Sequence, residues 1–332
     1  TDVSDNFLDS AWYFLRYPDN RNSEEVFNRE WINRMLPVDK YVGGAEHAAM
    51  HLLYARFFTK ALRDMGYLDF DEPFKSLVHQ GTILGADGQK MSKSKGNTVA
   101  PDDYIEKYGS DVFRTYLAFG FAYTEGGPWS DEGIKAIDRF LGRVQRVVEK
   151  LVEERATDSA SAKPYGADEK ELQYVRHTTI QSVTTDLEHF QLNTSVARLM
   201  ELTNAMYKYD ALPVRNLPLV EETLRDLLIL LAPFAPHFCE EMWETLGYEG
   251  FLFARETQWP VADPAAMVKD EVELAVQVNG QVKYRILVPS NAEKDDIERL
   301  ALQDAKAAQY LQDRQIVKVI VVKGRLVNVV VK

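Results

Sequence analysis

The sequence predicts a multidomain protein in which an incomplete α/β part precedes a bundle of helices and a small ββαββ unit. Three observations support this prediction. A strand, a helix, a second strand and a polar loop follow one another within residues 1–128, as in an α/β fold. Apolar residues recur with a helical period through residues 129–255. Two strand pairs flank a helix in residues 271–332, after a proline-containing linker at 256–270.

The α/β part contains few candidate strands. Residues 37–42 are expected to form a short strand that ends at Gly43-Gly44. Apolar side chains near a period of 3.6 then predict a helix from Ala45 to about Met65. Residues 74–84 are predicted to form a buried strand, and turn-forming residues 85–88 follow it. Both ends of this unit therefore look incomplete.

Five helices are predicted in the bundle. The first begins after Ser130, because a hydroxyl cap and early acidic residues suit a helix N-terminus, and it runs to about Arg155. The other four are expected at 168–189, 194–209, 219–231 and 237–246. Small residues with proline and glycine separate the first two helices. This pattern is typical of an antiparallel helical bundle.

The C-terminal unit has clear turn signals. Asn279-Gly280 is typical of a type I′ turn and predicts a hairpin of strands 272–278 and 282–288. Ser290 and Glu293 match a capping box, which predicts a helix at about 291–312. Residues 315–322 and 326–331 are expected to form a second hairpin.

The composition is that of a soluble globular protein. Apolar residues make up 45% of the chain and charged residues 27%, which excludes a disordered or collagen-like chain. The only cysteine, Cys239, forbids an intramolecular disulfide and fits a reducing cytoplasm. No charge-free apolar run reaches about 18 residues, so no transmembrane helix is expected. The chain begins Thr1-Asp2-Val3 without a methionine, so we expect it to be a piece of a longer protein.

The net charge of −12 argues at first against a nucleic-acid partner. This charge is unevenly distributed. Residues 271–332 carry ten basic and eight acidic residues, a net charge of +2, which leaves −14 for residues 1–270. Any contact with RNA must therefore depend on local basic patches, and the net charge alone does not exclude it.

The most informative motif is the loop sequence Lys90-Met91-Ser92-Lys93-Ser94. Two lysines three residues apart, with hydroxyls between them, can move onto a polyphosphate. Each ammonium at about 5 Å from a phosphate charge contributes roughly 3 kcal/mol at an effective dielectric constant near 20. That attraction accelerates a reaction only if it is stronger in the transition state. The alternative is a solvated basic turn without function.

This pentapeptide matches the second signature of the class I aminoacyl-tRNA synthetases. Within that class, the chain resembles the leucyl-tRNA synthetases of the bacterial type over nearly its whole length. Five further segments carry the resemblance in the expected order: residues 9–17, 37–47, 51–58, 108–111 and 276–280. The resemblance implies a partial Rossmann-like core, an anticodon-binding-like bundle and a C-terminal domain that contacts tRNA. The first class signature, His-x-Gly-His, and an editing domain have no counterpart here.

The resemblance also implies site residues. The residues expected to act in catalysis are Lys90, Ser92, Lys93 and Ser94. The residues expected to bind ATP or the adenylate are Gly43, Gly44, Glu46, Gln80, Gly81, Leu84 and Lys93. The leucine pocket is expected at Phe7, Tyr13, Tyr41 and His47, because ring walls suit a branched aliphatic side chain. His47 and His51 have a metal-pair spacing, but without a third ligand no metal site is expected.

The implied reaction forms leucyl-adenylate from leucine and ATP, with Mg²⁺ on the phosphates, and transfers leucine to the 2′-hydroxyl of the terminal adenosine of tRNA(Leu). Expected tRNA contacts are Arg139, Arg143, Arg146, Lys318, Lys323 and Arg325. The missing N-terminal half of the enzyme is an expected partner, so the chain alone is predicted to be inactive. A cytoplasmic monomer without membrane contact is expected. Two alternatives stay open: another class I synthetase for an aliphatic amino acid, and a non-catalytic tRNA-binding subunit.

Overall fold

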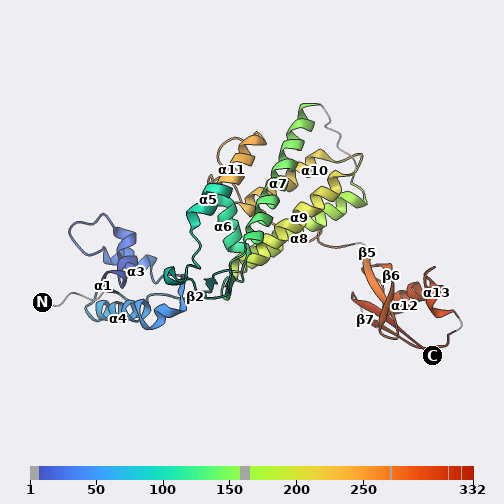
Figure 1. Cartoon of the computed structure of the whole chain (residues 1–332), viewed down its shortest axis with the longest axis horizontal. Helices are drawn as coiled ribbons and strands as arrows, with labels where there is room; N and C mark the ends of the chain where they lie inside the picture. The colour runs from blue at the N-terminus through green and yellow to red at the C-terminus, as the bar shows by residue number, and fades with distance from the viewer. Residues whose placement is uncertain (1–6, 158–164, 270, 313, 323) are drawn as a thin grey trace.

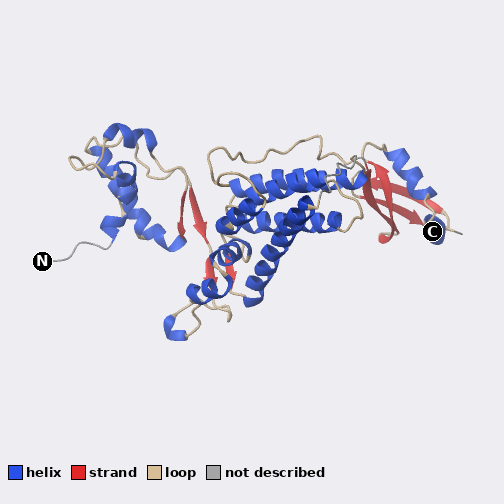
Figure 2. Cartoon of the chain, turned by 90° about the horizontal axis from the view of Figure 1, so that it is seen from above, coloured by secondary structure: helices blue, strands red, loops and turns tan. Residues whose placement is uncertain are grey.

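The computed structural model describes residues 7–157, 165–269, 271–312, 314–322 and 324–332. These residues form an elongated molecule with three successive parts (Figure 1). Short helices and a parallel strand pair lie at the N-terminal end, long helices lie in the middle, and a sheet lies at the C-terminal end. Figure 2 shows the strands concentrated in two places, between the N-terminal helices and the long helices and next to the C-terminus.

The N-terminal part is built on a small βαβ unit. Strand β1 (Tyr41–Gly44) pairs in parallel with β2 (Leu77–Gln80), and helix α4 (His51–Asp64) connects them. Three shorter helices precede this unit: α1 (Phe7–Ser10), α2 (Tyr13–Arg16) and α3 (Arg29–Met35). Its buried cluster among the described residues is small and contains Phe14, Leu15, Phe27, Ile32, Ala55 and Leu68.

Three predictions for this part are corrected by the structure. Gly43 and Gly44 are the last two residues of β1 and not a break after it, because both pair with β2. A 3₁₀ helix at Ala45–Ala49 precedes α4, and the irregular backbone of Met50 separates the two. The strand expected at 74–84 divides at Gly81 into β2 and β3 (Thr82–Leu84), which pair with different partners. Neither strand is deeply buried: Leu77 is 40% exposed.

A connecting region carries the lysine-rich motif. Strand β3 pairs in parallel with β4 (Gly126–Pro128), and the chain between them forms α5 (Pro101–Tyr108) and α6 (Ser110–Phe119). The motif lies in the loop after β3 and ends in a short 3₁₀ helix at Lys93–Lys95. Helix α6 packs on the long helices, since Val112 and Tyr116 belong to their buried cluster.

All five predicted helices of the bundle are present, each within about two residues of the expected bounds. They are α7 (Asp131–Ala156), α8 (Ala167–Glu188), α9 (Leu192–Asp210), α10 (Leu217–Leu231) and α11 (Pro236–Thr245). The Ser130 side chain accepts a hydrogen bond from the Gly133 N–H at 3.2 Å, so it caps α7 as the sequence predicts. The three residues between α8 and α9 force these helices to run antiparallel.

A polar network lies within the bundle. Arg176 of α8 donates to Asp226 of α10 at 2.6 Å, and both side chains are about nine-tenths buried. Arg176 also pairs with the more exposed Glu222 at 2.7 Å. The buried Tyr209 hydroxyl donates to Glu169 at 2.7 Å, and desolvation by burial raises the pKa of Tyr209 to about 12. These contacts fix the register of α8, α9 and α10 because a shift would leave a charge buried without a partner.

The C-terminal part is a four-stranded sheet covered on one face. Its order is β6-β5-β8-β7, with β5 (Glu271–Val278) and β8 (Leu326–Val331) in parallel at the centre. The outer strands are β6 (Gln281–Pro289) and β7 (Ile316–Val322). Positive φ angles at Asn279 and Gly280 agree with the predicted hairpin turn.

The single helix predicted for the C-terminal part is a pair of helices. Helices α12 (Lys294–Gln303) and α13 (Ala307–Leu311) stand in its place, and the chain turns at Asp304 between them. The predicted capping box is wrong, because α12 begins after Glu293 and no cap residue side chain bonds to its first turn. Ile297, Ala301 and Ala307 complete the core beneath the sheet.

Polar side chains join neighbouring parts of the described chain. Lys40, just before β1, donates to the Glu188 carbonyl at the end of α8 at 3.3 Å, and its ammonium lies 4.8 Å from the Phe190 ring centre. Asp111 of α6 accepts from the Phe238 N–H at 2.6 Å and lies 3.0 Å from His237 Nδ1, so it holds the first turn of α11. No described helix is long and apolar enough to cross a bilayer.

Candidate functional site

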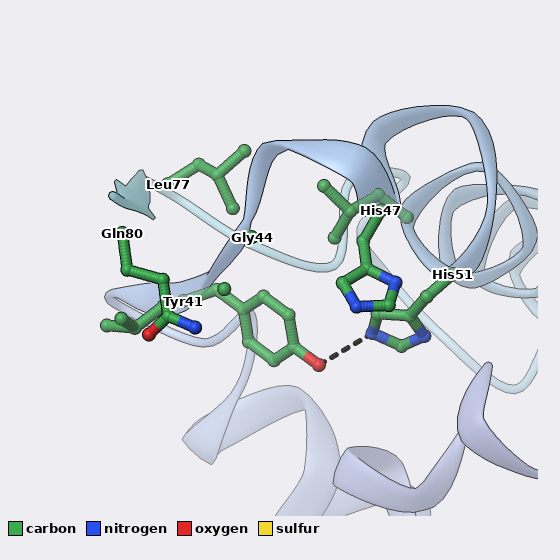
Figure 3. A pocket seen from close by; sticks show the side chains of 9 residues that line it. Tyr41, Gly44, His47, His51, Leu77 and Gln80 are labelled. Carbon is green, nitrogen blue, oxygen red and sulfur yellow. Dashed lines mark hydrogen bonds between the residues drawn. The ribbon is translucent and has the colours of Figure 1, made fainter. Parts of the chain in front are cut away.

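A cavity of about 240 Å³ lies along the parallel strands β1 and β2 and extends to their carboxyl ends at Gly44 and Gln80 (Figure 3). Ligand sites of α/β sheets are found at this edge, because the strands end there and the following loops surround the space. Its walls come from both strands, from the turn after β1 and from the start of α4: Tyr41, Val42, Gly43, Gly44, His47, His51, Leu52, Leu77 and Gln80.

A chain of hydrogen bonds fixes one wall of this cavity. The Tyr41 hydroxyl lies 2.6 Å from His51 Nε2 and 2.8 Å from the Tyr13 hydroxyl. The Tyr41 ring stacks on Phe74 with 3.8 Å between ring centres. Figure 3 shows the Tyr41 ring pointing toward the two histidines. Since ring and hydroxyl are both held, Tyr41 presents a rigid surface to the cavity.

The two histidines contribute a second wall of the cavity. Burial, with a smaller contribution from neighbouring His47, lowers the pKa of His51 below its usual value of 6.5. His51 is therefore neutral near pH 7. The Nδ1 atoms of His47 and His51 are buried and have no hydrogen-bond partner among the described residues. The aromatic ring of Tyr41 and the neutral imidazole of His51 favour an aliphatic ligand over a charged side chain.

The four residues expected in the leucine pocket take different places. Tyr41 and His47 line the cavity, whereas Tyr13 lies behind Tyr41 and reaches it through the shared hydroxyl contact. Phe7 does not line the cavity; its ring stacks on Tyr54 of α4 at 6.0 Å. His51 and Leu77 line the cavity although the sequence did not single them out for the pocket. The i, i+4 spacing of His51 from His47 was the sequence signal that could have placed His51 on the same side of the cavity as His47.

The residues expected to bind ATP are also divided. Gly43, Gly44 and Gln80 line the cavity, whereas Gly81, Leu84 and Glu46 do not. The Glu46 carboxylate lies directly against Gly44, where an added Cβ would stand 2.3 Å from Oε2. Gly44 therefore leaves the space in which this carboxylate lies beside the cavity mouth.

The lysine motif lies on a separate surface loop. Lys90 and Lys93 are exposed, and the Oγ atoms of Ser92 and Ser94 lie 2.8 Å apart. None of the motif residues lines the cavity. The ammonium groups are thus accessible to a phosphate ligand while the serines hold the turn in shape. Within the described residues, no group of three or more His, Cys, Asp or Glu side chains is arranged to hold a metal ion.

The candidate RNA contacts lie on two surfaces. Arg143 and Arg146 of α7 flank Tyr207 of α9: the Arg143 guanidinium lies 4.4 Å from the ring centre, and Arg146 Nε donates to the hydroxyl at 3.2 Å. Arg139 is exposed on the same helix. Lys318 and Arg325 are exposed in the C-terminal sheet, whereas Lys323 lies outside the described residues.

Two protein-family models match this chain. The model "tRNA synthetases class I (I, L, M and V)" matches residues 1–126, and the model "Anticodon-binding domain of tRNA ligase" matches residues 169–298. The first contains the cavity and the lysine motif. The second begins inside α8 and ends inside α12.

Curated relatives cover the chain from end to end. A leucine–tRNA ligase of Caldanaerobacter subterraneus is 59% identical over 331 residues, 99% of this chain and 40% of the relative. A leucine–tRNA ligase of Clostridium perfringens is 57% identical over all 332 residues and 40% of its own length. The chain thus spans about two fifths of the length of these relatives.

Solved structures agree with the fold. A LeuRS of Agrobacterium radiobacter, in a ternary complex with tRNA and LeuAMS, superimposes on the whole chain with a TM-score of 0.81 at 34% identity, over 43% of its own length. A Mycobacterium tuberculosis methionyl-tRNA synthetase with bound methionyl-adenylate matches 72% of the chain and 49% of its own, with a TM-score of 0.59 at 18% identity. The second match concerns the fold alone.

Proposed function

Because this chain belongs to the leucine–tRNA ligase family of class I synthetases, we propose that it forms part of an enzyme that attaches leucine to tRNA(Leu). The cavity with its rigid ring wall, in a chain whose relatives are leucine–tRNA ligases at 55–59% identity, carries this proposal. The proposed reaction has two steps: formation of leucyl-adenylate from leucine and ATP, and transfer to the 2′-hydroxyl of the terminal adenosine.

The cavity is the proposed site of the leucine side chain. Tyr41, Leu77 and the neutral His51 offer a surface without net charge. Such a surface favours burial of a branched aliphatic group by roughly 25 cal/mol per Å² of apolar area. Tyr13 and Phe7 support the site from behind in this proposal, since each contacts a residue of the wall or of α4.

The lysine motif is the proposed phosphate clamp. Lys93 and Lys90 would approach the phosphates of ATP, and Ser92 and Ser94 would hold the turn that presents them. ATP would enter with Mg²⁺ already on its phosphates, because this ion commonly keeps its waters and binds through substrate oxygens. Gly43, Gly44, Gln80 and Glu46 are the proposed neighbours of the adenylate; Gly81 and Leu84 would position the start of the loop.

The remaining length is the proposed tRNA-binding part. The family model for anticodon binding and the complex of the Agrobacterium LeuRS with tRNA support this assignment. Arg139, Arg143 and Arg146 of α7, with Lys318, Lys323 and Arg325 of the C-terminal part, are the proposed phosphate contacts. We propose domain boundaries at 1–128, 129–255 and 271–332, with a linker at 256–270.

A second polypeptide region is needed to complete the α/β part. Among the described residues, the sheet of β1 has only β2 as a neighbour, and Leu53 and Phe57 of α4 are 55% and 67% exposed. Parallel sheets of two strands with exposed apolar helices are not independently stable. We propose that the part of the enzyme that precedes this chain pairs with β1 and covers α4, and that the completed enzyme is a cytoplasmic monomer.

An enzyme of full family length tests the function. This chain would replace the aligned region of the Caldanaerobacter relative, and the chimera would be assayed for amino-acid-dependent pyrophosphate exchange and for tRNA charging. We expect activity with leucine to exceed activity with isoleucine or valine by at least about 100-fold in kcat/KM. A preference for isoleucine or valine would support the first alternative. Exchange without any amino-acid dependence would contradict the proposal.

Two variants separate the roles within the chimera. Lys93→Ala is expected to lower kcat for pyrophosphate exchange about 100-fold, because it removes a charge that stabilises the leaving phosphates. Lys95→Ala in the same turn is the matched control.

Tyr41→Phe is expected to raise KM for leucine about tenfold, with the exposed Tyr17→Phe as control. The chain by itself is expected to be inactive, and clear activity would support a self-sufficient site.

A further inference from the structure

We propose that Asp87 and Asn97 form a clasp that positions the lysine motif, residues 90–94, for the phosphate step. This inference rests on the proposed function and adds two positioning residues that lie outside the motif itself. Neither side chain lines the cavity. Both act through the backbone of the loop that carries Lys90 and Lys93.

Asn97 connects three points of the loop. Its Oδ1 accepts a hydrogen bond from the Ser92 backbone N–H at 2.9 Å, in the middle of the motif. Its Nδ2 faces both carboxylate oxygens of Asp87 at 3.2 and 3.1 Å, and the carbonyl of Lys90 at 3.4 Å. One amide therefore joins the residues before, within and after the motif, and both of its ends are used.

Asp87 supplies the fixed end of the clasp. Its Oδ1 also accepts from the Gln89 N–H at 3.0 Å. These bonds from Gln89 and Asn97 lower the pKa of Asp87, with a smaller contribution from the charge of Lys95. The carboxylate is thus charged at neutral pH, and charge-assisted hydrogen bonds are the stronger kind.

The turn beneath the clasp has room only for glycine at position 85. An added Cβ at Gly85 would stand 2.7 Å from Asp87 Oδ1 and 3.0 Å from Asn97 Nδ2. The backbone there is held by bonds from Gly85 N to the Gln89 carbonyl at 2.8 Å and from Gly88 N to the Gly85 carbonyl at 2.9 Å. The preceding carbonyl, of Leu84, accepts from Trp129 N at 3.0 Å. The clasp is therefore anchored through β3 to the packed region around Trp129.

The other end of the clasp holds Ser92, the residue that precedes Lys93. Ser92 is the N-cap residue of the 3₁₀ turn Lys93–Lys95, and its Oγ lies 2.8 Å from Ser94 Oγ. Fixing the Ser92 N–H fixes the start of this turn, and with it the direction in which Lys93 leaves the backbone. A displacement of about 1 Å at a charged catalytic group can lower a rate by roughly 100-fold, so such an anchor affects catalysis without touching substrate.

A reciprocal exchange of the two side chains tests the clasp in the full-length chimera. Asn97→Asp keeps the acceptor for Ser92 but sets two carboxylates against each other, and Asp87→Asn keeps one acceptor but removes the charge. The double variant, Asp87→Asn with Asn97→Asp, restores a donor opposite a carboxylate. Positions that act as a pair are expected to show this non-additivity.

Two measurements decide the outcome. In leucine-dependent pyrophosphate exchange, Asn97→Asp is expected to lower kcat/KM for ATP by at least about tenfold with KM for leucine unchanged, and the double variant to recover to within about threefold. Trypsin, which cleaves after lysine, is expected to cut the loop at Lys90, Lys93 or Lys95 faster in Asn97→Asp than in the parent or the double variant.

Each result has one consequence. If Asn97→Asp leaves kcat/KM for ATP within about twofold, or if the double variant recovers neither activity nor tryptic resistance, the clasp is refuted. If faster tryptic cleavage in Asn97→Asp is accompanied by a higher KM for leucine or by lower thermal stability, the whole site is loosened. That result would also refute the clasp. If the parent chimera lacks leucine-dependent exchange, the proposed function fails, and the tryptic rates alone decide whether the two side chains hold the loop.

Discussion

The helical bundle and the N-terminal βαβ unit differ in how much buried apolar packing each has from its own residues. The bundle buries a continuous row of leucines in α10, among them Leu224, Leu227 and Leu230 at 0% exposure, and pairs its internal charges. Among the described residues, the buried cluster of the N-terminal unit has six members, while Leu53 and Phe57 are exposed to solvent. We therefore expect the region that holds the candidate leucine cavity to depend on contacts from outside this chain, and the bundle to be stable without them.

Removal of the partner of a buried charge tests whether the bundle is stable by itself. Arg176→Ala removes the partner of the buried Asp226 and is expected to destabilise the bundle by about 3–5 kcal/mol, since an unpaired charge stays buried. Arg198→Ala removes an exposed pair with Glu201 and should change the free energy of unfolding by less than about 1 kcal/mol. Urea denaturation followed by circular dichroism measures both. Equal effects would contradict the assigned role of the buried pair.

Leucine substitutions in α10 and α4 test the difference between the two regions. Leu227→Ala in α10 is expected to cost about 2–5 kcal/mol, because a full side chain is lost from a packed interior. Leu53→Ala in α4 should cost less than about 0.5 kcal/mol in the chain alone, since that side chain is largely solvated. In the full-length chimera the second value should rise. An unchanged value there would argue against coverage of α4 by the preceding part of the enzyme.

Hydrogen exchange compares the two regions without a mutation. Amides of β1 and β2, such as those of Val42 and Val78, are expected to exchange at least about tenfold faster than that of Leu227. The reason is the small buried cluster behind the two strands. Mass spectrometry of the chain after timed labelling measures the rates. Equal protection in both regions would show that the N-terminal unit is stable by itself.

A small pH dependence of stability is expected, and it is confined to the N-terminal unit. Burial lowers the pKa of His51 from 6.5, so below that pH the unfolded chain binds more protons than the folded one. Stability should therefore be full above pH 6.5 and decline as the pH falls through the pKa of the folded protein. Glu72 does not titrate in this window, because its salt bridge to Arg56 holds its pKa at about 2.

His51→Gln should flatten this decline, whereas His79→Gln on the exposed face of β2 should leave it unchanged. The measurement is the thermal midpoint by tyrosine fluorescence at about pH 7.5 and about pH 5.5. A decline of the same size in both variants would assign the proton uptake to other groups.

Local signals in the sequence predicted much of the fold. Ser130 predicts the start of α7, and Asn279-Gly280 predicts the hairpin of β5 and β6, because each acts on its own neighbours. The division of residues 74–84 at Gly81 was not predictable in this way. The partner of β3 is β4, contributed by Gly126–Pro128, and the sequence pattern of a strand does not specify a distant partner.

In the candidate site, too, local sequence signals were predictive and contacts between distant residues were not. The resemblance pointed to Tyr13, Tyr41 and His47, and the lysine motif was recognisable from five adjacent residues. The bond between Tyr41 and His51 and the link from Asn97 to Asp87 depend on how the backbone folds back, which no periodicity contains. The side chains proposed to contact a ligand were thus easier to single out from the sequence than the side chains that hold them in place.

The contact between Asp111 and the first turn of α11 has a mechanical consequence. One carboxylate bonds to the backbone of Phe238 and approaches the His237 ring, so α6 and α11 cannot slide past each other without breaking that attachment. We therefore expect α6, which follows the lysine motif, and α11, the last helix of the bundle, to shift together when either is displaced.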